Sequence, residues 1–457
     1  MEAVRVDKYD FVVCGGGVSG VAAAVSAARE GLSVALIERL GILGGTATAG
    51  GINQLLGGRK LDKNNKHVRV VGGIFDEVTD RLIEEGAAIE PDTVDLSFNP
   101  YGWYPRMASG ISCDENALKI CLDDICAEAG VRVYFNTVVT SAEVAGTKIR
   151  ALSVFNKDGF VRIEADAFAD CTGDADLAVM CGVPFDKGRE EDGLTTMTSL
   201  EMHVEHVDAN ELVSYQNANQ SPKLVEIIDR LRESGEWDFE SDIFVTVKLL
   251  EDDVFLVNVV HQKGVDGTNE AEVSRALAKG RKDCVRLFKV MQKHLPGFKN
   301  ARIRKIADNL GVRETRRIRG AYTVSIEDAL SGKKYEDTVA STTYNFDLPD
   351  PLKAGYDPML GSTRNPKTDR KYVVIRIPYR SLICKEIDNI IFAGRSISVC
   401  RHVMGASRII GPAFMTGQAA GTAAVLAKGS FSSVDTDALR ALLWRRGVLN
   451  PDELPFD

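Results

Sequence analysis

A glycine-rich turn between an apolar segment and an alanine-rich segment constrains the fold most strongly. The apolar run from Tyr9 to Cys14 leads into Gly15-x-Gly17-x-x-Gly20, and a second apolar run, residues 34–37, ends on Glu38. A strand, a tight turn, a helix and a second strand with an acid at its end hold the ADP half of a dinucleotide. The order of these features predicts a Rossmann-like unit at the start of the chain.

Each glycine of this turn has a physical reason. Gly15 permits the tight turn, Gly17 lets the backbone approach the pyrophosphate, and Gly20 allows the helix to pack closely on the strand. The N–H groups and dipole at the helix start then face the phosphates. We expect Glu38 to accept hydrogen bonds from ribose hydroxyls, and its carboxylate disfavours the 2′-phosphate of NADP.

Composition excludes several classes of protein. The 457 residues are enough for two or three domains, and a net charge of −9 argues against nucleic-acid binding. No signal-peptide core and no run of eighteen apolar residues is present, so no membrane span is expected. The nine cysteines are scattered without a C-x-x-C, which predicts buried free thiols, no metal site and a reducing, cytoplasmic location.

The rest of the chain alternates between strand and helix patterns. The predicted helices are 113–129, 210–234, 270–294 and 412–428, and the predicted strands are 131–135, 137–144, 149–156, 160–163, 167–171, 242–250, 254–261, 372–382 and 389–393. The change of character near Thr198 indicates an inserted second domain.

Three features favour FAD over NAD. The apolar strand 389–393 ends in Gly394 about 370 residues beyond the first motif, although an NAD domain normally closes within one domain length. Gly44-Gly45-Thr46 follows the ribose acid, where an extended FAD would run toward its flavin. A further strand, 167–171, ends in the Thr172-Gly173-Asp174 turn.

These motifs together resemble the FAD-dependent oxidoreductases of the glutathione-reductase-like superfamily over nearly the whole chain. The resemblance also includes residues 311–320, 377–382, 393–398 with His402 and Arg408, and the helix 417–424. It implies an α/β fold in which a Rossmann-like FAD-binding domain of glutathione-reductase type is interrupted by an α+β substrate domain with a mainly antiparallel sheet. The expected domains are 1–197 and 381–457 for FAD, and 198–380 for the substrate.

The loop from Gly44 to Asn53 is also similar to a region of fumarate reductase and succinate dehydrogenase flavoproteins. Members with covalent flavin carry a histidine there, but this loop has none and the nearest is His67. No histidyl-flavin bond is expected at this loop.

The predicted FAD contacts lie in several separate segments. They are Gly15, Gly17, Val18, Ser19, Gly20, Glu38, Arg39, Gly44, Gly45, Thr46, Thr48, Gly50, Gly51, Val138, Thr172, Gly173, Asp174, Gly394, Arg395, Gly411, Pro412 and Ala413. At the last three, the helix start offers its positive dipole end to charge that develops on the flavin during reduction.

Few side chains are candidates for moving a proton, because the chain has six histidines. His402 lies just after the Gly394 turn, and is either a general base or acid, or a hydrogen-bond partner of FAD. His261, at the end of a predicted strand, is the second candidate. The remaining histidines, His67, His203, His206 and His294, are expected at the surface.

An arginine cluster surrounds Glu314. Arg313, Arg316, Arg317 and Arg319 form either an ion-pair network between domains or, with Arg313 facing a cavity, a grip on an anion. We expect Arg313 and Arg408 to be catalytic together with His402. Asn258, His261, Arg316 and Tyr379 are the expected substrate-binding residues.

The leading prediction is an FAD-dependent oxidoreductase (a dehydrogenase) that exchanges a hydride between flavin and a small polar or anionic substrate. It would dehydrogenate C–OH, C–N or C–C, or reduce C=C. The alternatives are a flavin-dependent isomerase or lyase without net redox, and a non-enzymatic flavin-binding protein. A small-molecule substrate and a separate electron acceptor are the expected partners, because no second fingerprint for NAD(P)H is present; a homo-oligomer is compatible with the sequence.

Overall fold

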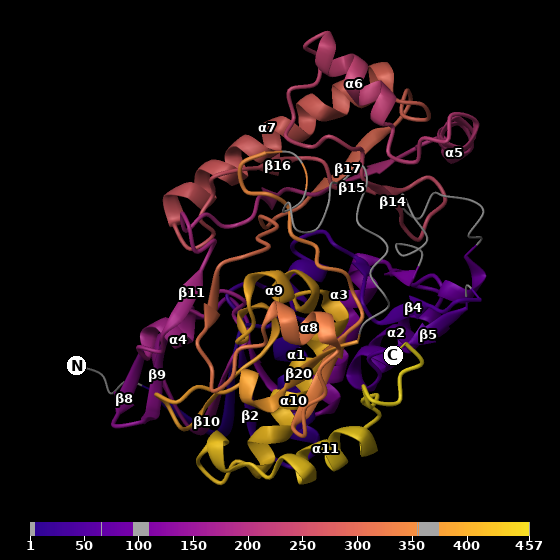
Figure 1. Ribbon diagram of the computed structural model, residues 1–457. Coiled ribbons are helices and arrows are strands. Elements are labelled where there is room, and N and C mark those ends of the chain that lie inside the picture. Colours follow the sequence, from indigo (N-terminus) through magenta and orange to yellow (C-terminus); the bar gives the residue numbers. More distant parts are fainter. Residues whose placement is uncertain (1–4, 65, 95–108, 354, 356–373, 457) are drawn as a thin grey trace.

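The computed structural model describes residues 5–64, 66–94, 109–353, 355 and 374–456. Two lobes are apparent in Figure 1, and both chain ends belong to the larger, lower one. Residues 200–307 contribute the hydrophobic core of the smaller lobe, and the larger core includes side chains from Phe11 to Phe456.

A seven-stranded sheet organises the larger lobe. Its strands are β1 (Arg5–Cys14), β2 (Val34–Ile37), β7 (Arg132–Tyr134), β8 (Val138–Ala145), β9 (Lys148–Asn156), β10 (Gly159–Asp170) and β21 (Ile390–Phe392). The order is β7-β2-β1-β10-β9-β8, and β21 also pairs with β10. Strands β7, β2, β1, β10 and β21 are parallel, whereas β8, β9 and β10 form an antiparallel meander.

The predicted strands 160–163 and 167–171 form one continuous strand. β10 pairs with β1 from Arg5↔Val161 to Cys14↔Asp170, while its first half also pairs with β9. The prediction left residues 164–166 out of both strands, but β1 supplies backbone partners on both sides of Glu164 and Asp166. The distant strand β21 joins this sheet, as the FAD-type fold requires.

Two glycine-containing helices pack closely in this lobe. α1 (Val18–Arg29) contacts β1 and β2, and α10 (Ile410–Leu426) lies against it. A Cβ on Gly417 would lie 2.1 Å from the Ser19 carbonyl oxygen, and one on Gly421 would lie 2.0 Å from that of Ala23. The helix predicted from Pro412 begins two residues earlier, where a missing N–H still removes no helical bond.

The smaller lobe combines an antiparallel sheet with three helices. The sheet order is β14 (Thr246–Lys248), β15 (Phe255–Val257), β13 (Met202–Glu205) and β17 (Arg302–Ile306). α7 (Glu270–His294) matches the predicted helix and is capped by Asn269. The predicted helix 210–234 is instead α5 (Ala209–Ala218) and α6 (Val225–Glu233), because Pro222 lies between them and cannot continue a helix.

The segment after the second lobe returns to the larger core. Buried side chains of this segment, among them Ile318, Val339 and Ile377, pack in that core. The domain boundary expected at residue 380 stays a prediction. The remaining helices and strands are β3 (Gln54–Leu55), β4 (Arg59–Leu61), β5 (His67–Arg69), α2 (Gly73–Glu84), β6 (Ile111–Ser112), α3 (Glu115–Glu128), α4 (Asp176–Met180), β11 (Phe185–Lys187), β12 (Thr198–Ser199), β16 (His261–Gln262), β18 (Arg316–Ile318), α8 (Ile326–Ser331), β19 (Thr338–Thr342), β20 (Ile375–Pro378), α9 (Arg401–Ser407) and α11 (Thr436–Arg445).

The described helices bear on the question of a membrane span. None of them is by itself long and apolar enough to cross a membrane. α9 and α10 reach that length and composition only when taken together, and they are bent by 94° relative to each other.

Candidate functional site

The turn between β1 and α1 leaves space for a ligand. Gly15 adopts a φ of +99°, and Gly17 caps α1 without a side-chain hydrogen bond. A Cβ on Gly17 would meet nothing within 4 Å. The next loop forms a wall of this space, because the Gly44 N–H donates to the Gly16 carbonyl oxygen at 2.8 Å. An uncapped helix start beside two glycine backbones fits the pyrophosphate of a dinucleotide.

Glu38 is held against this turn. Its Oε2 accepts the Gly16 N–H at 2.6 Å and its Oε1 accepts the Leu40 N–H at 2.8 Å. Burial raises the pKa of the Glu38 carboxyl. Each carboxylate oxygen has a second lone pair, so the predicted acceptance of ribose hydroxyls stays a prediction. The neighbouring Arg39 side chain is exposed, and Val138 is exposed on β8.

The Thr172-Gly173-Asp174 turn is tied to the segment that returns from the second lobe. Arg395 donates to the Gly173 carbonyl oxygen at 2.8 Å, to Asp174 and to the Val312 carbonyl oxygen. Thr315 donates to Asp174 Oδ1 at 2.8 Å, and Arg316 bonds Asp174 and Asp176. These side chains join the returning segment to the turn, and the predicted contacts of Arg395 with FAD and of Arg316 with substrate stay predictions.

The second lobe rests on the loop from Gly44 to Asn53. The Ala49 carbonyl oxygen accepts the N–H groups of Asp308 and Asn309 at 3.1 and 3.0 Å. His203, on β13, donates from Nε2 to the Gly51 carbonyl oxygen at 2.8 Å. The expectation of a surface position for His203 is wrong, because the residue is buried, and this burial lowers its pKa.

Three predicted site residues come together beside this contact. Arg313 donates to the Met197 carbonyl oxygen at 3.1 Å and to Asn258 Oδ1 at 3.3 Å. His261 Nε2 lies 2.9 Å from Asn258 Oδ1 and 3.5 Å from the Arg313 guanidinium. Burial and the positive charge of Arg313 lower the pKa of His261 to about 3, so its imidazole is neutral at physiological pH.

Glu201 is a site residue that sequence reasoning missed. Its side chain is buried, Ser199 donates to Oε1 at 2.7 Å, and Oε2 has no hydrogen-bond partner among the described residues. Burial raises its pKa to about 7, against the attraction of Arg313. The alternation Leu200-Glu201-Met202-His203-Val204, with an acid and a histidine on one face of an apolar strand, was the available signal.

Stability should depend on pH through Glu201. Its folded pKa of about 7 exceeds the ordinary 4.5, so between these values the folded protein binds more protons than the unfolded chain. Stability therefore falls as pH rises through this window, by about 3 kcal/mol in total. We expect Glu201→Gln to flatten this part of the profile when thermal midpoints are compared across it. An unchanged profile in that variant would contradict the assignment.

Glu314 is the centre of a buried ion network. Its carboxylate accepts from the Thr196 N–H at 2.8 Å, from Arg317 at 2.7 Å and from Arg401 on α9 at 3.1 Å. Of the two interpretations of this arginine cluster, the ion network describes Arg317, whereas Arg313 belongs to the partly buried group with Asn258 and His261. Arg319 pairs with Asp186 at the surface.

The other predicted catalytic and substrate residues lie in separate surroundings. His402 is half-buried and follows Arg401 in α9, and Arg408 donates to Asp347 at 2.8 Å. Tyr379 is buried, and its hydroxyl donates to the Phe431 carbonyl oxygen at 2.8 Å, as in a packing role. The predicted roles of these three residues stay predictions.

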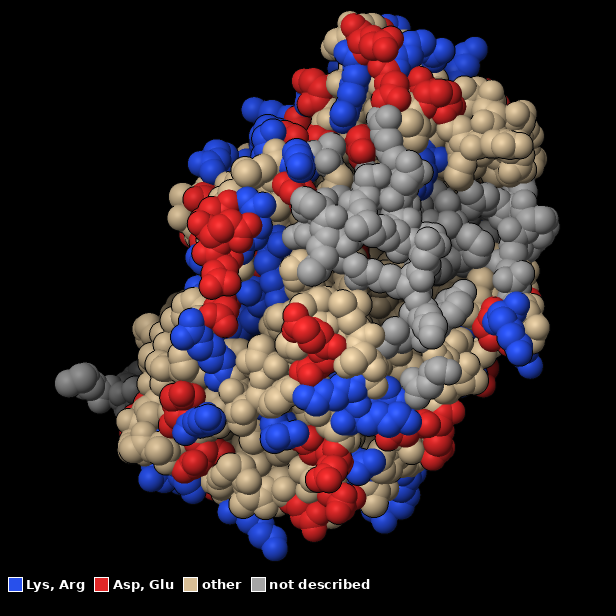
Figure 2. Space-filling model, in the orientation of Figure 1, with Lys and Arg blue, Asp and Glu red and all other residues tan. Residues whose placement is uncertain are grey.

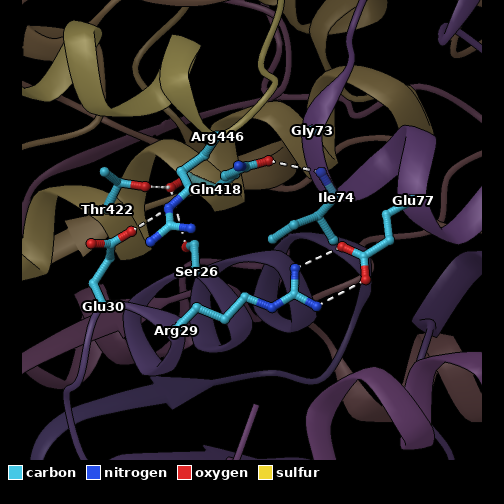
Figure 3. A pocket seen from close by; sticks show the side chains of 9 residues that line it. All are labelled: Ser26, Arg29, Glu30, Gly73, Ile74, Glu77, Gln418, Thr422 and Arg446. Carbon is cyan, nitrogen blue, oxygen red and sulfur yellow. Dashed lines mark hydrogen bonds and ion pairs between the residues drawn. The ribbon is translucent and has the colours of Figure 1, made fainter. Parts of the chain in front are cut away.

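A pocket of 90 Å³ lies outside this region, between α1, α2, α10 and the C-terminal end of α11. Figure 3 shows its two arginines already paired, Arg29 with Glu77 and Arg446 with Glu30. Gln418 accepts the Ile74 N–H at 3.0 Å across the same pocket. This space is small and its charges are matched, so it does not compete with the glycine turn as a cofactor site.

The surface and the thiols add two observations. Acidic and basic side chains are mixed over both lobes on the face in Figure 2. All nine cysteines are free. The described residues contain no group of three His, Cys, Asp or Glu side chains that would hold a metal ion.

Several solved structures are similar to this chain over most of its length. A p-nitrophenol 4-monooxygenase from Pseudomonas putida is 13% identical, with 97% of this chain and 85% of that chain covered and a TM-score of 0.48. A geranylgeranyl bacteriochlorophyll reductase-like protein from Thermoplasma acidophilum is 12% identical, with coverages of 96% and 82% and a TM-score of 0.44. A myxobacterial chondrochloren halogenase is 11% identical, with coverages of 96% and 79% and a TM-score of 0.46.

None of the curated proteins matches the sequence significantly. The local similarity to fumarate reductase stays a prediction. The family model described as FAD dependent oxidoreductase matches residues 10–443. The glycine turn, the distant strand β21 and this match agree: the chain belongs to the FAD-dependent oxidoreductase family, and its cofactor is FAD.

Proposed function

We propose that this protein exchanges a hydride between FAD and a small polar or anionic substrate, dehydrogenating C–OH, C–N or C–C or reducing C=C. The observation that carries the proposal is a cluster of polar side chains in which Arg313, Asn258 and His261 are partly buried and Glu201 is buried. It lies where the second lobe rests on the Gly51 turn. Polar groups of both charge types at a lobe boundary are typical of substrate sites.

The cofactor site is assigned to the glycine turn. The N–H groups at the start of α1, the backbone of Gly17 and the Gly44–Gly45 loop would hold the pyrophosphate of FAD. When bound, FAD supplies the hydride acceptor or donor, and the chain supplies binding, orientation and proton movement. The first turn of α10, from Gly411 to Ala413, has no acidic residue and would favour negative charge at its end.

Arg313 is assigned the role of binding the anionic group. A guanidinium binds a carboxylate with two parallel hydrogen bonds, which a lysine ammonium cannot reproduce. The neutral His261 and the Asn258 amide add uncharged hydrogen-bonding groups to the same wall. Among the remaining candidates, His402 is proposed to move a proton or to bind FAD, and Arg408 to hold substrate charge.

Arg313→Lys should raise KM about 10- to 100-fold, because a bidentate grip worth about 1.5–3 kcal/mol is reduced to a point charge. The measurement is anaerobic bleaching of the flavin absorbance at varied substrate concentrations. Arg319→Lys is the matched control, since Arg319 pairs with Asp186 at the surface. Equal KM values for both variants would contradict the assigned role of Arg313.

The function itself is tested by a panel of hydroxy acids, amino acids and unsaturated acids under anaerobic conditions. We expect purified protein to be yellow, to release FAD on denaturation, and to bleach with at least one substrate. Turnover without bleaching and without an acceptor would support an isomerase or lyase. Protein that carries FAD, never bleaches and is indifferent to His402→Ala would support a flavin-binding role without catalysis. A cytoplasmic location, predicted from the scattered thiols, belongs to the same proposal.

A further inference from the structure

The Glu201 carboxyl is only half satisfied. Ser199 donates to Oε1 at 2.7 Å, while Oε2 has no hydrogen-bond partner among the described residues. The residue is 1% exposed. A buried carboxyl oxygen without a partner is costly to maintain, whether it is ionised or carries a proton. Such an oxygen points to a ligand group that completes it.

The position of Glu201 places it at the contact between the lobes. It precedes β13, and a Cβ built on Gly51 would lie 3.5 Å from the Glu201 Cβ and 3.6 Å from His203 Nε2. The Ala307 N–H donates to the Glu201 carbonyl oxygen at 2.9 Å. Two neighbouring segments therefore fix the backbone of Glu201 beside the glycine loop predicted to bind FAD.

The charged and titratable groups around Glu201 come from three directions. Arg313, on the segment after β17, lowers the pKa of Glu201 through its positive charge. Cys284, on α7, has its pKa raised by the negative charge of Glu201. His203, two residues along the same strand, is turned to Gly51, and burial lowers its pKa. His261 contacts Arg313 and is neutral. Arg313 is therefore the positive charge of the cluster and Glu201 its acid.

We propose that Oε2 of Glu201 is the atom that exchanges a proton with the substrate, and that the substrate is a small carboxylate with a hydroxyl or amino group on the neighbouring carbon. This inference rests on the proposed function. The carboxylate matches Arg313, and the O–H or N–H matches the unpartnered oxygen. Burial and the opposing charge of Arg313 hold the pKa of Glu201 at about 7, where both protonation states are populated.

The proton step balances with the chemistry already assigned. In the oxidative direction the O–H or N–H bond of the substrate breaks and its proton moves to Oε2. The electron pair of that bond forms the new C=O or C=N bond, and the hydride lost from the carbon is taken by FAD, the oxidant of the proposed function. In the reductive direction Glu201 returns the proton.

Proton uptake on binding of oxalate, which is redox-inert here, tests the inference in the FAD-loaded protein. One carboxylate of oxalate would contact Arg313 and the other would face Oε2, where two negative charges cannot both persist. At about pH 8, calorimetry in buffers of different ionisation heat should detect uptake of about one proton per oxalate. The wild-type affinity should fall roughly tenfold per pH unit above about pH 7, and E201Q should lose both effects.

Three controls separate the possible failures. Proton uptake that survives in E201Q overturns the role of Glu201, whereas oxalate binding that R313K does not weaken overturns the anion site of the proposed function. If oxalate does not bind, or if E201Q does not fold, infrared spectra of the wild-type protein decide. The inference is supported if a protonated carboxyl band titrates near pH 7 and if S199A moves the midpoint of this titration to higher pH. That shift is expected because S199A removes the hydroxyl that favours the ionised form. Absence of any band that titrates near pH 7 contradicts it.

Discussion

Gly17→Ala should give a folded protein that loses most of its FAD. The backbone at Gly17 has a φ of −65° and a ψ of 174°, which alanine adopts without strain, and a new Cβ would meet no protein atom within 4 Å. That Cβ would instead occupy the space assigned to the pyrophosphate. Overpacking of a close contact costs about 1–3 kcal/mol, so FAD affinity should fall about 10- to 100-fold.

The measurement is the ratio of flavin to protein absorbance, with the thermal midpoint of the apo form as the second readout. Gly20→Ala is the contrasting variant, because its Cβ would lie 1.8 Å from the Gly15 carbonyl oxygen. It should lower the stability of the apo protein, which Gly17→Ala should not. If Gly17→Ala retains FAD with wild-type affinity, the pyrophosphate does not bind at this turn.

Glu314→Ala should destabilise the protein by about 3–5 kcal/mol, because two buried arginines would lose their counter-charge. The Glu314 side chain is 0% exposed, and those of Arg317 and Arg401 are 7% and 9% exposed. The Thr196 N–H would lose its acceptor as well. Urea and thermal midpoints of the FAD-loaded protein measure the effect.

Asp186→Ala is the control variant, because it removes an ion pair at the solvent-exposed surface. Its partner Arg319 is exposed, so the midpoints should not move measurably. A similarly small effect for Glu314→Ala would mean that the interior tolerates the loss of this carboxylate. Loss of substrate binding together with stability would indicate that Glu314 also positions the adjacent Arg313.

Local signals predicted two helices close to their observed bounds. α3 follows Asp114 and α7 follows Asn269, each of which accepts a backbone N–H in the first turn. The short helix α9 lacks a side-chain cap and went unrecognised. The predicted helix 210–234 is divided because Pro222 interrupts it. β10 is continuous because it pairs with β1 along its length. Residue propensities do not include pairing with a distant strand.

The cofactor could be predicted from the sequence because its motif has a fixed spacing within one βαβ unit. The grouping of Arg313, Asn258 and His261 required the fold, since these residues are separated by up to 55 positions. Glu201 was missed because an acid in a strand is ordinarily solvent-facing, whereas here it lies beside the Gly51 turn and is buried. The low pKa of His261, about 3, could not be predicted from the sequence, because it results from burial and from the charge of Arg313 in the fold.

The pairing of Ser199 with Gly311 marks the base of the second lobe. Two backbone hydrogen bonds, of 3.0 and 2.7 Å, join these residues where the chain leaves the larger lobe and returns to it. The ends of the intervening segment are thus as close as the ends of a β-hairpin loop. The chain therefore enters and leaves the second lobe at one short base, and further contacts with the loop from Gly44 to Asn53 hold the lobe against the larger one.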